Sequence, residues 1–332
     1  MRESSVALED PMTRRARFAL CGLVVALSAT PHGLTAQPTL QSQLVGHWRL
    51  VGTEQVRDGA PQAPTIGAAS VGFITYTADG HMLAQLGPAA RPKVRAADAT
   101  ADQVREQLRT QTSYFGTFTV NERTRTVTHH RDGSQVPGER DYVRTVGLAG
   151  SRLVLTTPTT MVDGKPRFAR LTWERVTPAP AQPSYDAAAR RAVAGTWELV
   201  EHKTTSAQGE VRQAFGPSPK GLFIFGESGH TTVQIVNPQR PTTPLAKTSE
   251  EEARALASSY LAYFGTYDVD LATRKIVVHT TSDLNPMNSG EDQIRFYEID
   301  GDTMYLQPPL AANGSVSRIT WRRVRISPSQ VY

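Results

Sequence analysis

The chain has 332 residues and one cysteine, and its 36 lysines and arginines outnumber its 31 aspartates and glutamates to give a net charge of +5. Basic residues are scattered and often stand next to acidic ones, so the charge pattern gives no support to a nucleic-acid-binding surface. The length is greater than one typical hydrophobic core accommodates and predicts two domains.

The first 36 residues have the pattern of a secretory signal peptide. Arg14, Arg15 and Arg17 precede an apolar run over residues 18–27, and small residues follow up to Ala36. The run is too short to span a bilayer permanently. Cleavage after Ala36 would therefore leave a periplasmic or secreted chain with no integral membrane segment, exported by the Sec or the twin-arginine route.

The only cysteine, Cys21, lies within this predicted signal. The mature chain would have no thiol, which excludes disulfides, thiol catalysis and cysteine metal ligands. Histidines recur in the chain, but none forms an H-x-H or H-E-x-x-H pattern, so we predict no metal site. No nucleophile elbow, phosphate loop or dinucleotide fingerprint occurs either, and we predict no cofactor.

A repeat organises the rest of the chain. SYFGTF begins at Ser113, and AYFGTY begins at Ala262, 149 positions later. The same spacing aligns further pairs, which include Gly46 with Gly195, Trp48 with Trp197, Gly80 with Gly229, Arg91 with Arg240 and His130 with His279. We therefore predict two copies of one domain, at residues 43–176 and 194–324. The segment 177–184 between them has three prolines and is predicted to be a linker of limited flexibility.

Within each copy the apolar signal has the period of a β-strand. In the first copy the strand-like segments are residues 47–51, 72–77, 81–86, 116–120, 126–130, 141–148, 151–157 and 170–176. Turn residues separate these segments, and the second copy repeats them. Eight short strands at close spacing predict a mainly β chain of two tandem antiparallel up-and-down β-barrels. An open β-sandwich is the alternative architecture.

One short helix is predicted in each copy, directly before Tyr-Phe-Gly-Thr. In the second copy, Ser249 with Glu252 forms a capping box before an apolar stripe that continues to Phe264. In the first copy, Thr100 with Gln103 repeats this pattern. The repeated hexapeptide is therefore interpreted as the junction where the helix ends, glycine permits a close turn and the next strand begins.

The order of several motifs resembles the bacterial and fungal lipocalin-like domain family. These motifs are Gly-x-Trp followed by Leu-Val on the first strand, Gly-Pro-x-Pro-x-Gly at 216–221, Tyr-Phe-Gly-Thr, a histidine two strands later, and Thr-Trp-x-Arg at the end. The resemblance covers residues 43–176 and 194–324, and it implies a calycin-type barrel that holds small apolar or amphipathic molecules. The first copy departs from the family loop at 67–72, so the second copy is expected to be the better binder.

Two tryptophans of the first strands are expected to close one end of each barrel. An indole there typically packs against the last strand, with a guanidinium stacked on its face. The expected groups are Trp48 with Trp173 and Arg175, and Trp197 with Trp321 and Arg323.

Eight side chains are candidate ligand contacts. An arginine in the middle of an apolar strand needs a carboxylate if it points inward, and a ligand can supply one. A histidine offers a neutral imidazole, a tyrosine a hydroxyl donor and a glutamine an amide, although each has an ordinary structural role as the alternative. The candidates are Arg144, Arg295, His130, His279, Tyr114, Tyr263, Gln85 and Gln234.

These features favour an exported protein that binds a small hydrophobic or amphipathic molecule. One alternative is an enzyme of the same fold, in which His130 or His279 and a nearby tyrosine and arginine promote proton transfer or cyclisation. The other is an interaction module with filled barrels and an apolar outer patch, for which the sequence names no protein partner.

Overall fold

The computed structural model describes residues 38–64, 69–96, 98–180 and 188–325. The predicted signal peptide therefore lies outside the described residues. Among the residues that are described, no helix is long and apolar enough to cross a membrane.

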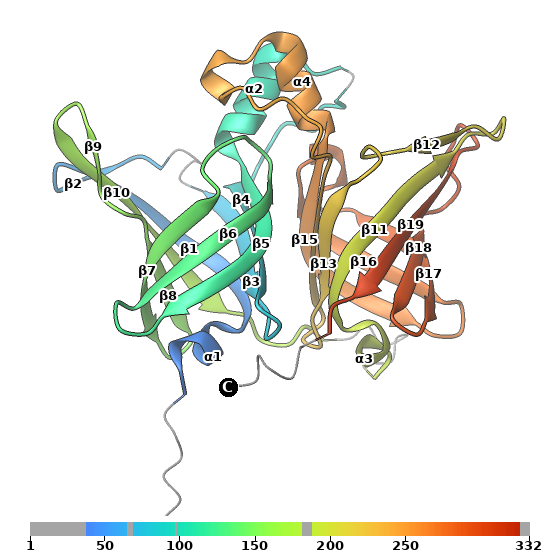
Figure 1. Cartoon of the computed structure of the whole chain (residues 1–332), viewed down its shortest axis with the longest axis horizontal. Coiled ribbons are helices and arrows are strands. Elements are labelled where there is room, and N and C mark those ends of the chain that lie inside the picture. The colour runs from blue at the N-terminus through green and yellow to red at the C-terminus, as the bar shows by residue number, and fades with distance from the viewer. Residues whose placement is uncertain (1–37, 65–68, 97, 181–187, 326–332) are drawn as a thin grey trace, which may run out of the picture. The chain divides into compact units, whose positions relative to one another are not determined.

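The first repeat forms one closed β-sheet, which we call barrel 1 (Figure 1). Its sheet order is β2-β1-β3-β4-β5-β6-β7-β8-β10-β9, and antiparallel pairing of β1 with β10 joins its ends. Eight strands form the barrel wall, while the short β2 and β9 extend hairpins. The strands are β1 (Gly46–Arg57), β2 (Ala60–Gln62), β3 (Ser70–Tyr76), β4 (His81–Pro88), β5 (Thr112–Asn121), β6 (Thr126–Ser134), β7 (Asp141–Ala149), β8 (Arg152–Thr156), β9 (Thr160–Val162) and β10 (Lys165–Arg175).

The second repeat forms barrel 2 with the same topology. Its order is β12-β11-β13-β14-β15-β16-β17-β18-β19, closed by pairing of β11 with β19. Closure of both sheets confirms the predicted pair of eight-stranded antiparallel barrels and excludes the open sandwich. The strands are β11 (Gly195–Thr205), β12 (Val211–Gln213), β13 (Lys220–Phe225), β14 (His230–Val236), β15 (Tyr260–Asp270), β16 (Lys275–Asp283), β17 (Asp292–Asp300), β18 (Thr303–Gln307) and β19 (Val316–Arg323).

The predicted helices are present as α2 (Ala101–Thr110) and α4 (Glu250–Ser258), and both capping boxes form. Two five-residue helices that the sequence did not reveal, α1 (Leu40–Leu44) and α3 (Ala189–Val193), precede the first strand of each barrel. Two single turns of 3₁₀-helix complete the elements, η1 (Leu245–Lys247) and η2 (Pro286–Asn288).

The glycine of Tyr-Phe-Gly-Thr has a different role from the predicted helix-to-strand turn. Strands β5 and β15 begin several residues before Gly116 and Gly265, and each glycine sits at a bulge in the pairing with the next strand. A Cβ atom on Gly116 would lie 1.9 Å from the backbone oxygen of His130, and one on Gly265 would lie 2.0 Å from that of His279. Glycine is therefore required because two backbones approach closely within the sheet.

The tryptophan plug at one end of each barrel is confirmed. Trp48 is fully buried, its indole N–H donates to the backbone oxygen of Leu44 at 2.8 Å, and the Arg175 guanidinium lies 4.1 Å from its ring centroid. Arg175 also donates to the backbone oxygens of Gln43 and Val45, at the end of α1. Hydrogen bonds and a cation–π contact thus join the short helix, the indole and the guanidinium. Barrel 2 repeats this arrangement with Val193, Trp197 and Arg323.

The two barrels contact each other through corresponding surfaces. Helix α2 packs against α4, and an apolar cluster joins side chains of β4 and β5 to side chains of β13, β14 and β15. Two arginines at equivalent positions of the repeat, Arg91 and Arg240, each reach the backbone of the opposite barrel. Arg91 donates to Asp283 O and Leu284 O, and Arg240 donates to Ser134 O and Gln135 O. The two donor arginines are 149 positions apart, and so are the residues that accept from them. Each barrel therefore gives the other the same contact, as the two subunits of a symmetric dimer do.

Replacing Arg240 by alanine is expected to lower the free energy of unfolding by about 1–3 kcal/mol, because partly buried carbonyl oxygens lose a charged donor. Arg91→Ala should have a similar effect. Urea unfolding followed by tryptophan fluorescence measures both. The control is Arg152→Ala, an exposed position on β8, which should change the free energy by less than about 0.5 kcal/mol. If Arg240→Ala unfolds at the same urea concentration as this control, the reciprocal contacts do not stabilise the chain.

Candidate ligand-binding site

Strand β7 supplies two polar side chains of the barrel 1 interior, Tyr142 and Arg144. Its burial alternates, so that Tyr142, Arg144, Val146 and Leu148 face inward while their neighbours face solvent. The sequence left open whether Arg144 points inward or outward. The structure shows that Arg144 lies on the inward face of β7. On neighbouring β6, Val127, His129 and Arg131 are the buried set.

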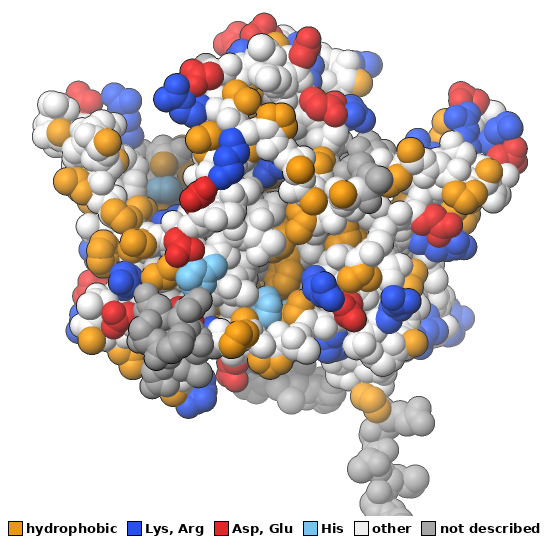
Figure 2. Space-filling model, turned by 180° about the vertical axis from the view of Figure 1, so that it is seen from behind, with side chains coloured by type: hydrophobic (Ala, Val, Ile, Leu, Met, Phe, Trp, Pro, Cys, Tyr) orange, Lys and Arg blue, Asp and Glu red, His pale blue; other side chains and the backbone are white. Residues whose placement is uncertain are grey.

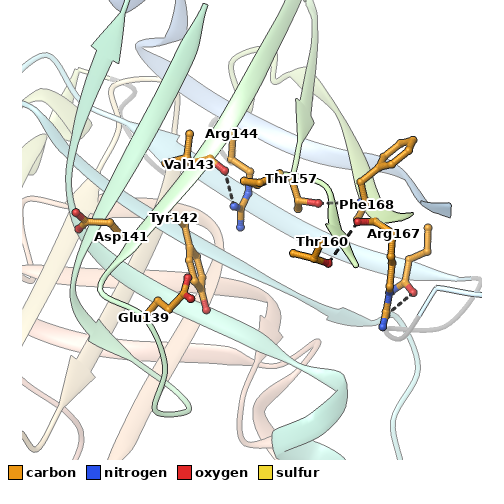
Figure 3. A pocket seen from close by; sticks show the side chains of 12 residues that line it. Glu139, Asp141, Tyr142, Val143, Arg144, Thr157, Thr160, Arg167 and Phe168 are labelled. Carbon is orange, nitrogen blue, oxygen red and sulfur yellow. Dashed lines mark hydrogen bonds between the residues drawn. The ribbon is translucent and has the colours of Figure 1, made fainter. Parts of the chain in front are cut away.

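A pocket of about 400 Å³ opens among β1, β7 and β10 of barrel 1 (Figure 3). This volume lies in the range of small-molecule sites. Tyr142, Arg144, Phe168 and Ala169 line it together with Gln55 and Thr157. Glu139 and Asp141 lie at its exposed rim. The pocket thus combines the Tyr142 ring and the Ala169 side chain with one inward guanidinium, while the Phe168 ring turns toward Arg170 on the outer face of β10.

Arg144 is only lightly engaged by the protein. Its Nη1 donates to the backbone oxygen of Val143 at 2.7 Å, as Figure 3 shows, and its guanidinium carbon lies 4.9 Å from the Tyr142 ring centroid. Among the described residues, no carboxylate lies within salt-bridge distance of Arg144. Its charge is therefore available to a bound molecule.

Beneath Tyr142 lies a buried hydrogen-bonded chain of three side chains. The Tyr76 hydroxyl lies 2.7 Å from Nε2 of His129, and the Tyr114 hydroxyl lies 2.9 Å from Nδ1. The Tyr114 ring meets the Tyr142 ring edge to face at 5.4 Å. Burial first, and then the charge of Arg144, lowers the pKa of His129 to about 3, so this imidazole is neutral at pH 7.

Tyr114 is thus inside barrel 1, as expected for a candidate, whereas His129 was missed. The signal for His129 was present, because it shares the alternation of buried Val127. Its counterpart in the second copy is Val278, and for that reason the repeat drew attention to the neighbouring His130 instead.

The two histidine candidates lie outside the barrels, which corrects the expectation that they serve as interior polar contacts. His130 bonds Asp141 at 3.0 Å and the Thr119 hydroxyl at 2.9 Å. His279 bonds Asp292 at 2.7 Å and Asp268 at 3.1 Å. The physical reason is strand alternation: each follows an inward residue, His129 or Val278, and so faces the opposite way.

The two glutamine candidates also face away from the interiors, toward the contact between the barrels. Gln234 donates to the backbone oxygen of Ala84 in barrel 1 at 2.9 Å and accepts from the Tyr260 hydroxyl. Gln85 is buried, and its amide has no hydrogen-bond partner among the described residues. A sequence cannot reveal this placement without knowledge that a second barrel covers the strand.

In barrel 2 the inward arginine has a side-chain hydrogen-bond partner. Tyr263 is buried, and Arg295 donates to the side chain of Gln293 at 2.6 Å. Phe215, from the segment after β12, packs on the His202 ring at 5.5 Å and belongs to the buried core. The charge of Arg295 adds to burial in lowering the pKa of His202 to about 4, which places the two side chains close together.

The described surface carries both charges. Figure 2 shows lysine and arginine side chains interspersed with acidic side chains over the face in view. Positive and negative side chains are therefore mixed on this face.

The architecture defines a protein of two small antiparallel β-barrels. A family model of the lipocalin-like domain matches residues 45–176 and 194–324. The chain belongs to the lipocalin-like domain family, in two tandem copies, which confirms the resemblance seen in the sequence. This is a family of ligand-binding folds, and the match does not specify a ligand.

Solved structures give weaker similarities. A protein of unknown function from the DUF3598 family of Nostoc punctiforme is 9% identical, with 86% of this chain and 98% of that chain covered and a TM-score of 0.24. Isotype 1 transferrin-binding protein B from serogroup B Neisseria meningitidis is also 9% identical, with 84% and 76% covered and a TM-score of 0.21. Scores this low support no functional argument. No curated protein matches the chain.

Two histidines should titrate in opposite directions from the ordinary pKa of about 6.5. His129 has its pKa lowered to about 3, whereas hydrogen bonds to Asp292 and Asp268 outweigh burial and raise the pKa of His279. His129 therefore stabilises the fold fully above about pH 6.5, and this contribution is lost as the pH falls toward 3. His279 stabilises the fold below about pH 6.5, and this contribution is lost as the pH rises through its raised pKa.

Nuclear magnetic resonance of the imidazole nitrogens between pH 5 and 8 checks this assignment. The His129 signals should stay constant, and the His279 signals should move with a midpoint above about 6.5. A His129 signal that titrates near its ordinary pKa would contradict the buried tyrosine–histidine–tyrosine chain.

Proposed function

We propose that the protein is an exported carrier that holds a small hydrophobic or amphipathic molecule in barrel 1. The observation that carries this proposal is the pocket of about 400 Å³, lined by Tyr142, Phe168 and Ala169 with Arg144 as its inward cation. A largely apolar cavity with a few oriented polar groups is the usual form of a small-molecule site. Membership of a ligand-binding fold family supports the same function.

Export is supported by the signal-like pattern of residues 1–36. The absence of cysteine from residues 37–332 also suits an oxidising compartment, since no thiol is at risk there.

Barrel 1, rather than barrel 2, is the proposed binding copy. This reverses the expectation from the loop at 216–221, because Phe215 beside that loop packs on His202 and fills the interior near Arg295. In barrel 1, Gln55 and Ala169 line the pocket, whereas the paired side chains at their positions in barrel 2, Thr204 and Ser317, bond each other at 2.9 Å.

Binding accounts for the interior better than proton transfer does. Both ring nitrogens of His129 are engaged by tyrosine hydroxyls, and a pKa of about 3 is far from the value that suits a general acid or base at pH 7. His130 and His279, the histidines of the enzyme alternative, lie outside the barrels.

Native mass spectrometry of the protein taken from its own exported compartment, before and after organic extraction, tests the proposal. Additional mass that extraction removes would establish a carrier and give the mass of the ligand. A bare polypeptide that also takes up no apolar probe would contradict the proposal and direct attention to the outer surface.

Filling the pocket should weaken binding without unfolding the chain. Ala169→Phe places a ring in the cavity and should weaken the uptake of the fluorescent probe N-phenyl-1-naphthylamine at least about tenfold. Probe fluorescence titration measures this effect. The control is Thr145→Phe, which adds the same ring on the exposed face of β7. If both variants bind the probe like the unmodified protein, the pocket of barrel 1 is not the binding site.

A further inference from the structure

We propose that the barrel 1 pocket selects molecules that carry an acidic group, and that Arg131 and Arg144 supply the positive charge that recognises this group. The inference rests on the proposed carrier function and adds the chemical class of the ligand. Arg131 does not line the pocket itself, but its guanidinium lies against the Tyr142 ring that does, and the sequence did not single this residue out.

Arg131 is a buried cation without an anionic partner. Only 8% of the residue is exposed, and its guanidinium lies 4.0 Å from the Tyr142 ring centroid, against the same ring that Arg144 approaches. Its Nη1 donates to the Ser134 hydroxyl at 2.7 Å, but its buried Nε has no hydrogen-bond partner among the described residues. Burial of an unpaired charge is costly, so a bound anion would relieve a cost that the fold already bears.

The buried tyrosine–histidine–tyrosine chain leaves one hydroxyl hydrogen unused. A neutral imidazole donates from one nitrogen and accepts at the other, so His129 uses one hydroxyl hydrogen of its two tyrosine neighbours. One hydroxyl, of Tyr76 or Tyr114, therefore keeps a hydrogen to donate. Burial raises the pKa of Tyr114, and the charges of Arg144 and Arg131 oppose this effect. An oxyanion is the group that complements several donors and two cations.

Acidic side chains near the pocket do not neutralise this charge. Glu139 and Asp141 are exposed at the rim, and Asp141 pairs with His130 on the outer face. Across the described ranges, neither carboxylate lies within salt-bridge distance of Arg131 or Arg144. Arg167, at the open side of the pocket, adds further positive charge.

Barrel 2 shows how the same fold supplies its own anion. Asp283 stands where barrel 1 has Ser134, and Gln293 stands where barrel 1 has Tyr142. The Gln293 amide donates to the Asp283 carboxylate at 3.1 Å and its oxygen accepts from Arg295, so one carboxylate is connected to the inward arginine. Barrel 1 has the inward arginine, Arg144, and also has Arg131 where barrel 2 has Thr280. It has no carboxylate at the position of Asp283. The charge preference therefore belongs to barrel 1.

Two probes with one aromatic skeleton isolate the charge. 8-Anilinonaphthalene-1-sulfonate carries one acidic group, and N-phenyl-1-naphthylamine is the same ring system without it. Fluorescence titration of the full chain should show tighter binding of the sulfonate. Arg144→Gln should weaken the sulfonate at least about tenfold and the neutral probe far less. Ser134→Asp, which gives barrel 1 the residue that barrel 2 carries, should place a carboxylate beside Arg131 and likewise weaken the sulfonate selectively.

Arg152→Gln on the exposed face of β8 is the control for loss of one positive charge and should leave both affinities unchanged. If the neutral probe binds and the sulfonate binds no more tightly, or if Arg144→Gln weakens both probes equally, the charge selection is wrong and the carrier function stands. If neither probe binds the unmodified protein, the carrier function fails and the inference falls with it.

Discussion

Closure of each sheet by pairing of its first and last strands is the constraint on which the rest of the molecule depends. A closed antiparallel barrel has one inner and one outer face, and successive side chains must alternate between them. The bulges at Gly52 and Gly116 shift the register, and so they decide which members of the following segments point inward. Because of this alternation, Arg144 enters the interior while Val143 remains exposed, and His129 enters while His130 pairs with a surface carboxylate.

The duplication of this barrel created a second constraint, since each copy covers part of the other. The reciprocal donation by Arg91 and Arg240 fixes segments that lead directly into the interiors. Ser134, whose backbone accepts from Arg240, also accepts from Arg131 through its hydroxyl. A contact between the barrels is thus linked through Ser134 and Arg131 to Tyr142, which lines the pocket. Covalent linkage keeps this contact at high effective concentration, so the pocket of one copy is supported by the other.

Much of the fold was predictable because it depends on local signals. Strand number, the capping boxes at Thr100 and Ser249, and the tryptophan–arginine plug follow from alternation, spacing and side-chain chemistry. The site was less predictable because it depends on which face of a strand points inward, and on what covers it. Tyr114 and Arg144 face the interior of barrel 1, whereas Gln85 and Gln234 face the other barrel, a neighbour that no single strand encodes. The role of Phe215 depends on the path of a loop, which has no periodic signal.

The divergence between the two interiors is best understood as a balance between stability and binding. In barrel 2, Asp283 and Gln293 engage the inward arginine, and the interior needs no further partner to satisfy its charge. In barrel 1, the buried Arg131 without a carboxylate costs stability, and proteins tolerate such costs mainly at functional sites. A molecule that binds only the folded chain, and not the unfolded chain, raises the free energy of unfolding. The increase grows with the logarithm of the ratio of the ligand concentration to its dissociation constant. Under the proposed function, relief of the unpaired Arg131 charge adds to the binding energy, and the two copies of one fold divide support and binding between them.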